Sequence, residues 1–178
     1  EFAFNEEKVH VENSSAYHIA LLYMLDDIAG ILENMKDYFS SYVRANIKAS
    51  ADFCAYLCRP SGNLINTGDS SIDNNRRKYD IRAKKLGSES YLFSATQGKE
   101  GKQPERASIM YPKSGYYFYK QDHNLCTRFT DATWKMFKSG YSSRTHKHAD
   151  DLSFAMYSRG YDIFSDTGYY NYNSGNAY

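Results

Sequence analysis

The spacing of the apolar residues changes along the chain, and this change limits the possible fold more than any other feature of the sequence. In residues 14–35 and 36–57, apolar side chains recur every three or four positions, which is the period of an amphipathic helix. A third helical pattern covers about residues 74–95. After the polar linker at residues 97–104, short alternating stretches replace the helical pattern. The sequence therefore predicts an α+β arrangement with helices first and a sheet second.

Beyond the linker, six short segments have the composition of strands and are separated by turns rich in Pro, Gly, Asn and Asp. Such regular spacing is typical of an antiparallel β-sandwich. The last two segments, joined by a turn at Arg159 and Gly160, predict a hairpin that returns Asp166 toward His148. The expected strands cover residues 107–111, 116–120, 125–129, 133–138, 151–158 and 161–165.

The charge and cysteine content argue against several classes of function. The 22 basic and 21 acidic residues leave a net charge of +1, so no large field attracts nucleic acid or an anionic membrane. No apolar run approaches the roughly 20 residues of a membrane span. The three cysteines cannot all pair, and the spacing of Cys54 and Cys58 fits neither a disulfide framework nor a zinc ribbon. The 18 tyrosines suit sugar binding, although tyrosine-rich sheets also arise for structural reasons.

The densest group of chemically active side chains lies in residues 143–172. His146 and His148 are two positions apart, so on a strand both imidazoles point to the same side, and Asp150 continues the row. Such a row can begin either a metal site or an acid/base pair. Two imidazoles with one carboxylate from Asp150, Asp151 or Asp166 would supply three ligands for zinc. The spacing by itself leaves the metal site and the acid/base pair as alternatives.

A second polar group, residues 9–18, precedes the first predicted helix. Asn13, Ser14 or Ser15 can serve as the N-cap, and an ordinary capping segment would explain this composition. The start of a helix also offers backbone N–H groups that favour a bound carboxylate. A capping segment and a site for an acidic ligand both remain open.

Four segments together resemble the heparinase II/III-like polysaccharide lyases and their alginate-lyase relatives. They follow one another in the order of that family and span most of the chain, and the last is the most specific. The segments are E-N-S-S-A-Y-H at residues 12–18, R-P-S-G-N-L-I-N-T-G-D-S at 59–70, Y-P-K-S-G-Y-Y at 111–117, and H-K-H-A-D-D-L-S-F from 146 with D-T-G at 166–168.

The resemblance implies a multidomain α+β fold. Residues 1–98 would be the last helices of an incomplete (α/α) toroid. Residues 99–178 would be an antiparallel β-sandwich that is truncated at the C-terminus, so we expect this chain to be a fragment of a longer protein. The active cleft would lie between the two parts. The resemblance adds a periplasmic or secreted location to the expectations, with a cytoplasmic location as the alternative.

The resemblance also implies a reaction, the cleavage of a uronic-acid-containing acidic polysaccharide by β-elimination. Heparan sulfate, alginate and capsular polymers are all candidate glycans. The chemistry needs a group that neutralises the C6 carboxylate, a base that removes the C5 proton and an acid that protonates the leaving O4. The rival hypothesis is a catalytically silent glycan-binding protein, or a capsule or lipopolysaccharide assembly protein, on the same scaffold.

The motif positions assign roles to individual residues by resemblance. Asn13 is expected to neutralise the carboxylate, and His146 is expected to contact the uronate. Residues 61–71 contain no tyrosine, although lyases of this family carry an acid/base tyrosine after the corresponding turn. Expected substrate contacts are Glu12, Tyr17, His18 and Arg144, and expected ligands of a structural zinc are His148 and Asp166, with a third ligand beyond Tyr178.

Overall fold

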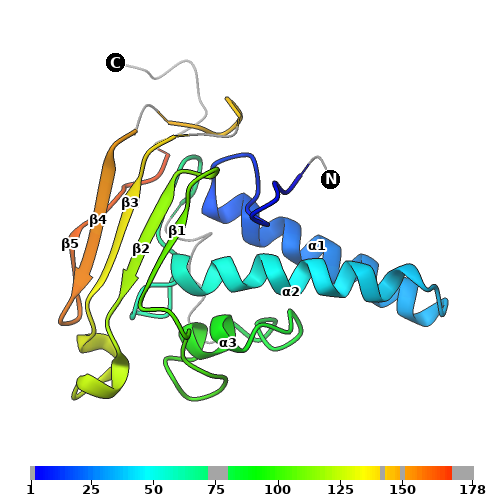
Figure 1. Cartoon of the computed structure of the whole chain (residues 1–178), viewed down its shortest axis with the longest axis horizontal. Coiled ribbons are helices and arrows are strands. Elements are labelled where there is room, and N and C mark those ends of the chain that lie inside the picture. The colour runs from blue at the N-terminus through cyan, green and yellow to red at the C-terminus, as the bar shows by residue number, and fades with distance from the viewer. Residues whose placement is uncertain (1–2, 72–79, 141–142, 149–150, 170–178) are drawn as a thin grey trace.

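In the computed structural model, two long antiparallel helices extend from one side of a sheet, and a third short helix lies beside them (Figure 1). The structure describes residues 3–71, 80–140, 143–148 and 151–169. The helices are α1 (Ser15–Asn34), α2 (Phe39–Leu57) and α3 (Glu89–Ala95). The strands are β1 (Ser108–Tyr111), β2 (Tyr116–Lys120), β3 (Trp134–Lys138), β4 (Ser153–Ser158) and β5 (Tyr161–Phe164).

Helix α1 packs lengthwise against α2, but only part of the apolar face that its sequence period predicts is buried, since Ile28 and Ile31 are 47% and 59% exposed. Ile19 and Leu22 are fully buried in the core, and Asp26 pairs with Arg44 and Arg82. Within the described part of the chain, α1 is the one helix whose length and composition would allow it to cross a membrane. Its packing against α2 and its ion-paired aspartate are those of a core helix.

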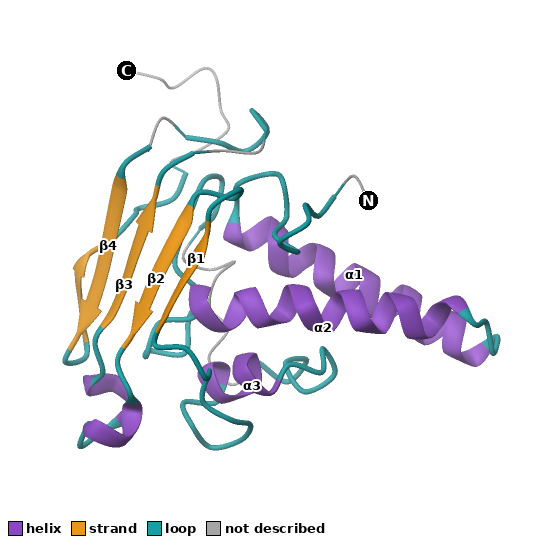
Figure 2. Cartoon of the chain, viewed as in Figure 1, coloured by secondary structure: helices purple, strands orange, loops and turns teal. Residues whose placement is uncertain are grey.

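The sheet is an antiparallel meander in which each strand pairs with the next, in the order β1-β2-β3-β4-β5 (Figure 2). Alternate residues of β2, β3 and β4 are buried, because one face of the sheet packs against the helices. Phe118, Met136 and Ala155 form one cross-strand row of this buried face. The indole Nε1 of Trp134 donates to the carbonyl of Tyr56 over 2.7 Å and so ties β3 to the end of α2.

A buried lysine completes the junction between the sheet and the helices. The Nζ atom of Lys120 donates to the carbonyls of Ala55 and Cys58 and to Oγ of Ser94. The carbonyls at the end of a helix have no partner within the helix, and this ammonium group satisfies that of Ala55 in α2 and that of its C-cap residue, Cys58. Burial lowers the pKa of Lys120 to about 8.

Two predicted elements differ from the structure. The strand expected at residues 125–129 is absent, and two 3₁₀ turns, His123–Leu125 and Phe129–Asp131, stand on either side of an irregular segment. Side chains stabilise these turns locally, because the Asp122 carboxylate accepts the N–H of Asn124 and Arg128 pairs with Asp131. The third helix begins only at Glu89, where the hydroxyl of Ser88 caps its first turn. Part of the longer helix expected there, residues 74–79, lies outside the described residues.

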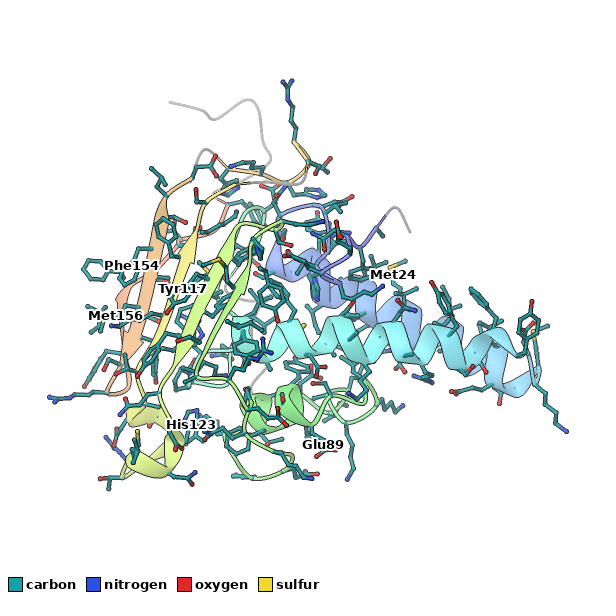
Figure 3. The ribbon with its side chains drawn as sticks, in the orientation of Figure 1. Met24, Glu89, Tyr117, His123, Phe154 and Met156 are labelled. Carbon is teal, nitrogen blue, oxygen red and sulfur yellow. The ribbon has the colours of Figure 1, made fainter. Side chains whose placement is uncertain are left out.

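The face of the sheet away from the helices carries a row of apolar side chains. Met110, Tyr117, Phe137 and Phe154 pair across four neighbouring strands, and each is at least 37% exposed. Figure 3 shows Phe154 and Met156 on this outer side. The described residues form a single sheet, so the second layer of the predicted sandwich is not among them. The predicted domain boundary after residue 98 falls between the last helix and the first strand, and it stays a prediction.

Candidate functional site

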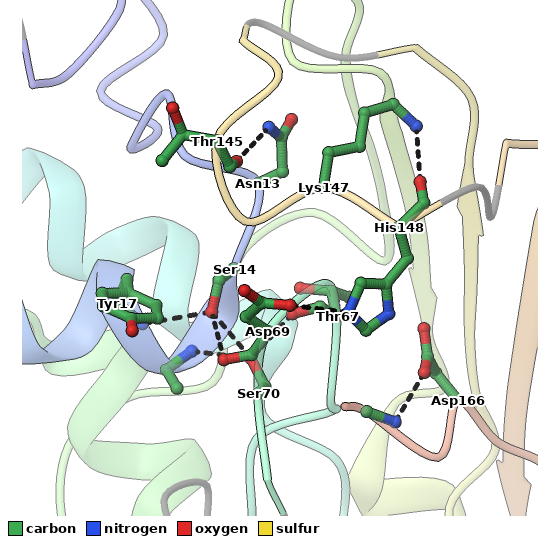
Figure 4. A network of polar contacts seen from close by, with 12 residues as sticks. Asn13, Ser14, Tyr17, Thr67, Asp69, Ser70, Thr145, Lys147, His148 and Asp166 are labelled. Atoms are coloured by element: carbon green, nitrogen blue, oxygen red, sulfur yellow. Dashed lines mark hydrogen bonds and ion pairs between the residues drawn. The ribbon is translucent and has the colours of Figure 1, made fainter. Parts of the chain in front are cut away.

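Three segments that are distant in the sequence meet at the start of α1 (Figure 4). They are the helix approach at residues 12–17, the loop at residues 66–70, and residues 143–148, which we call the strap. The loop and the strap are joined by the N–H of Asp69, which donates to the carbonyl of His146 over 3.1 Å. The motifs for which the sequence predicted functional roles therefore lie side by side.

Asn13 anchors the strap to the start of α1. Its side-chain Nδ2 donates to the carbonyls of Ser143 and Thr145 over 2.9 and 3.0 Å, and only 6% of the residue is exposed. Both amide hydrogens are therefore engaged by backbone carbonyls. In this arrangement the amide does not face an open cleft, which differs from the expected role in neutralising a sugar carboxylate.

His146 lies at the surface between a carboxylate and an aromatic ring. Its Nδ1 lies 2.9 Å from Oε2 of Glu12, and its ring stacks on that of Tyr17 with centroids 3.8 Å apart and planes 11° apart. Because an ionised carboxylate can only accept a hydrogen bond, Nδ1 is the donor in this pair, and in the neutral imidazole Nε2 then keeps a lone pair. Nε2 makes no hydrogen bond to the described residues. Such a carboxylate-oriented imidazole is equipped to accept a proton from a ligand.

The backbone at this site is held in an uncommon conformation. Asn13 and His146 have φ values of 64° and 52°, in the left-handed region that residues other than glycine rarely adopt. Each such residue costs on the order of 1 kcal/mol or more, so the surrounding contacts must hold it in place. Five other described residues that are not glycine, among them Lys8, Lys36 and Arg159, also have positive φ, so this conformation is not specific to the site.

The start of α1 is closed to ligands. The backbone N–H groups of residues 15–17 donate to the hydroxyls of Thr67, Ser70 and Ser14, respectively. Of the two alternatives that the sequence left open, these contacts favour the capping segment, because three backbone N–H groups of the first turn already donate to hydroxyls. Ser70 comes from a loop more than 50 positions away in the sequence, which is why local reasoning could not predict it.

The loop at residues 66–70 lies so close to the strap that it has no room for a side chain at its centre. Gly68 has a φ of 53°, and a Cβ atom added there would lie 2.2 Å from the carbonyl oxygen of His146. The loop backbone itself occupies the space next to the strap. This packing gives a physical reason why no large side chain, such as a tyrosine, stands at that point of the loop.

The two expected zinc ligands line one pocket of about 300 Å³ at the end of the β4–β5 hairpin. Figure 4 shows the ring of His148 between Asp69 and Asp166. Nε2 of His148 lies 2.7 Å from Oδ1 of Asp69, an acceptor when ionised, so in the neutral imidazole Nε2 is the donor and Nδ1 keeps a lone pair. Among the described residues no three His, Cys, Asp or Glu side chains are grouped to hold a metal, and Asp150 lies outside them. The pocket thus holds two side chains of types that can bind a metal, His148 and Asp166.

The remaining expected contacts occupy different environments. Arg144 is exposed on the strap, and Tyr17 is 37% exposed beside His146. His18 is in the core with 1% exposure, where Nδ1 accepts the N–H of His10 and Nε2 donates to the carbonyl of Ser50. Burial lowers the pKa of His18 to about 3, so it is a neutral structural side chain out of reach of a substrate.

Asp69 is the member of this site whose role the sequence did not reveal. Its backbone holds His146 and its carboxylate holds His148, so a single residue positions both histidines of the strap. The Gly-Asp-Ser segment stood out in the sequence only as a family-like motif. Its partners lie nearly 80 positions away, and the motif contains no signal for which side chains they are.

Comparisons with known proteins give one consistent family. Residues 103–178 match the family model described as Heparinase II/III-like, C-terminal. A stretch of 80 residues is 34% identical to a heparin-sulfate lyase from Bacteroides stercoris, covering 45% of this chain and 11% of that protein.

Solved structures extend the similarity over almost the whole chain. A heparinase III gene product has 24% identity and a TM-score of 0.81. A mutant of the heparan sulfate lyase HepC from Pedobacter heparinus has 18% identity and a TM-score of 0.81. Both alignments cover 98% of this chain, which spans only 27% and 28% of those structures. Residues 103–178 thus match the C-terminal domain of the heparinase II/III-like family, and the chain as a whole has the fold of the corresponding part of the heparinase structures.

Proposed function

We propose that this chain contributes the catalytic junction of a lyase that cleaves a uronic-acid-containing acidic polysaccharide by β-elimination. The observation that carries the proposal is the Glu12–His146 pair, an imidazole oriented by a carboxylate at the surface where helix and strap meet. Its unoccupied Nε2 can act as the base for the C5 proton. The heparin-sulfate lyase and heparinase relatives support a reaction of this class.

The surroundings of His146 suit a negatively charged sugar. Arg144 is exposed two positions before it on the same strap and can meet a carboxylate or sulfate group. Tyr17 presents an aromatic edge beside the imidazole. Asn13 and Asp69 then act by holding the strap, which keeps the imidazole fixed relative to the helix.

The fold around this site agrees with a toroid joined to a β-sandwich. The outward apolar row Met110, Tyr117, Phe137 and Phe154 is the kind of surface that a second sheet covers. The antiparallel α1–α2 pair is the kind of unit from which a helical toroid is built. A periplasmic or secreted location remains part of the same proposal.

A structural zinc ion is proposed in the pocket next to the strap. His148 would bind through Nδ1 and Asp166 through its carboxylate, with Asp69 fixing the orientation of the imidazole through Nε2. When bound, the ion would stabilise the fold by linking the strap to the end of the hairpin. A further ligand from outside the described residues would complete the sphere.

A catalytically silent glycan-binding or capsule-assembly protein is the second candidate. Two observations favour it: the amide of Asn13 is engaged by backbone carbonyls, and the helix N–H groups are capped. Neither group is then available to neutralise the C6 carboxylate of a uronate. Without such neutralisation the C5 proton is not acidic enough for fast elimination.

One assay separates the two candidates. The full-length protein is mixed with heparan sulfate, alginate and capsular polymers, and the ultraviolet absorbance of the C4=C5 double bond is followed over time. The lyase proposal predicts absorbance on at least one uronic-acid glycan. Measurable glycan binding without absorbance on any of them would leave the silent protein as the correct account.

A further inference from the structure

The turn between β1 and β2 belongs to a segment that the proposed chemistry does not use. This turn, residues 112–115, lies within Y-P-K-S-G-Y-Y, one of the four segments that resemble the lyase family. Ser114 is only 4% exposed, although it stands in a turn and carries a hydroxyl group. Buried polar groups are hydrogen-bonded as a rule, so Ser114 needs partners from elsewhere in the fold. Those partners lie in the segment that leads to Glu12.

Glu7 binds this turn through three hydrogen bonds. Its Oε1 accepts the N–H of Lys113 over 3.1 Å, and its Oε2 accepts the N–H and the hydroxyl of Ser114 over 2.8 and 2.6 Å. Nδ2 of Asn5 donates to the same hydroxyl oxygen over 2.7 Å. Hydrogen bonds to an ionised carboxylate are about twice as strong as those between neutral groups. Glu7 therefore fixes the segment before α1 to a turn of the sheet.

Glu7 lies in a closed loop that ends directly before Glu12. The N–H of Val11 donates to the carbonyl of Ala3 over 3.0 Å and joins the two ends of this loop. Inside the loop, the N–H of Glu7 donates to Oδ1 of Asn5 over 3.0 Å. These bonds make the loop a compact unit, so its attachment to the β1–β2 turn also sets the position of the backbone at Glu12.

The orientation of the Glu12 carboxylate depends on where this backbone is held. In the described part of the chain, the carboxylate accepts one side-chain hydrogen bond, from Nδ1 of His146 over 2.9 Å. The strap holds the loop on one side, because Oγ of Ser143 donates to the carbonyl of Val11 over 2.8 Å. The β1–β2 turn holds it on the other side through Glu7. Both attachments are needed to keep Glu12 and His146 in contact.

We infer that Glu7 is a positioning residue for the elimination, an inference that rests on the proposed lyase function. By holding the loop on the β1–β2 turn, Glu7 keeps the Glu12 carboxylate within hydrogen-bond distance of His146. It acts through Glu12 and takes no part in the proton transfer itself. The Y-P-K-S-G-Y-Y segment then serves the same function, because it supplies the three donors that Glu7 binds.

The test compares the full-length protein with its Glu7→Gln variant. Glutamine keeps the size of the side chain but replaces one accepting oxygen with an NH₂ group, which cannot accept from the turn. We expect kcat to fall roughly 10- to 100-fold while KM stays within about twofold, because the imidazole is misplaced and the glycan contacts remain. Glu6→Gln is the matched control, because Glu6 is exposed and contacts the same turn through a surface ion pair with Lys113. Its kcat should equal that of the wild type.

A double-mutant cycle with Glu12→Gln separates positioning from a general loss of structure. If Glu7 acts through Glu12, Glu7→Gln should change kcat by less than about twofold in the Glu12→Gln background. The same fall in kcat in both backgrounds would indicate a general structural defect and overturn the inference. If Glu7→Gln does not fold, Ser114→Ala takes its place in the cycle with the same two outcomes, because it removes the hydroxyl that Glu7 binds.

The inference and the proposed function fail in different ways. A wild type that releases unsaturated product, together with a Glu7→Gln variant of equal kcat, overturns the role of Glu7 alone. A wild type that forms no unsaturated product overturns the proposed function and the inference with it.

Discussion

At the scale of single residues, the buried environment of His18 keeps its imidazole neutral. The free energy of unfolding should therefore depend on pH through this residue. The N–H of His10 donates to Nδ1, so the ring proton must be on Nε2, which donates to the carbonyl of Ser50. These two hydrogen bonds are possible only for the neutral imidazole, because a protonated Nδ1 could not accept the N–H of His10. Burial, which is the largest cause, lowers the pKa from 6.5 to about 3.

The stability of the protein should therefore fall in mild acid. The unfolded chain takes up a proton at His18 below pH 6.5 and the folded chain does not, so the His18 contribution is complete above pH 6.5 and declines as pH falls toward 3. Between pH 6.5 and about pH 5, this one residue should remove about 2 kcal/mol of unfolding free energy. Urea titrations of wild type and His18→Gln should show a shallower pH dependence in the variant. Identical slopes would contradict the account of His18.

The histidines of the strap should differ in their effect on metal content. His148→Ala should lower both the zinc stoichiometry and the melting temperature, because a structural metal contributes folding energy. His146→Ala, on the same strap, is the control and should keep its zinc. Asp69→Asn should weaken zinc binding about 10- to 100-fold in a chelator competition, because it removes the charge that orients His148. Unchanged metal content in His148→Ala would remove this site from the proposal.

From the sequence, site residues could be predicted only where a family-like motif contains them. Glu12, His146 and His148 stand in family-like patterns, and the structure brings all three to the junction of helix and strap. The sequence could not show that Asn13 is engaged by the strap or that His18 is buried. Both facts depend on contacts between segments more than 30 positions apart.

At the scale of elements, two glycines allow a direct comparison of helix and loop. Gly30 lies inside α1 and nothing is within 4 Å of an added Cβ, whereas an added Cβ at Gly68 lies 2.2 Å from the carbonyl of His146. Gly30→Ala should stabilise the protein by about 0.5–1 kcal/mol, because alanine favours the helix. Gly68→Ala should destabilise it by more than about 1 kcal/mol, because of the positive φ and the displaced strap. Denaturant unfolding measures both, and a stable Gly68→Ala would show that loop and strap do not touch.

Periodicity located helices α1 and α2 and strands β2 and β3 well, and it failed at residues 125–129 and at the start of helix α3. Helices α1 and α2 and strands β2 and β3 begin and end within three residues of the prediction, because their apolar positions repeat over several turns or alternations. In residues 125–129 an alternating pattern is present but short, and turn-forming side chains on either side decide the backbone. Helix α3 begins only at Glu89, because the hydroxyl of Ser88 caps its first turn at that point.

At the scale of the whole molecule, the outward face of the sheet tests the proposed sandwich. Phe137 lies in the middle of the apolar row and is 38% exposed. If a second layer covers this row in the full-length protein, Phe137→Asp should cost several kcal/mol of stability, because it buries an unpaired charge. Leu125→Asp is the control, since Leu125 is 76% exposed in the turn after β2, and it should change stability by less than about 0.5 kcal/mol. An equally small effect of Phe137→Asp would argue against a covering sheet.

The central claim is that the imidazole held by Glu12 at the junction of helix and strap performs the elimination. The most direct measurement is the rate at which the full-length protein and its His146→Ala variant release unsaturated uronate products from a uronic-acid glycan. The account predicts such products from the wild type and at least a roughly 100-fold slower release from the folded variant. Equal rates from both proteins, or wild-type products that carry no double bond, would contradict it.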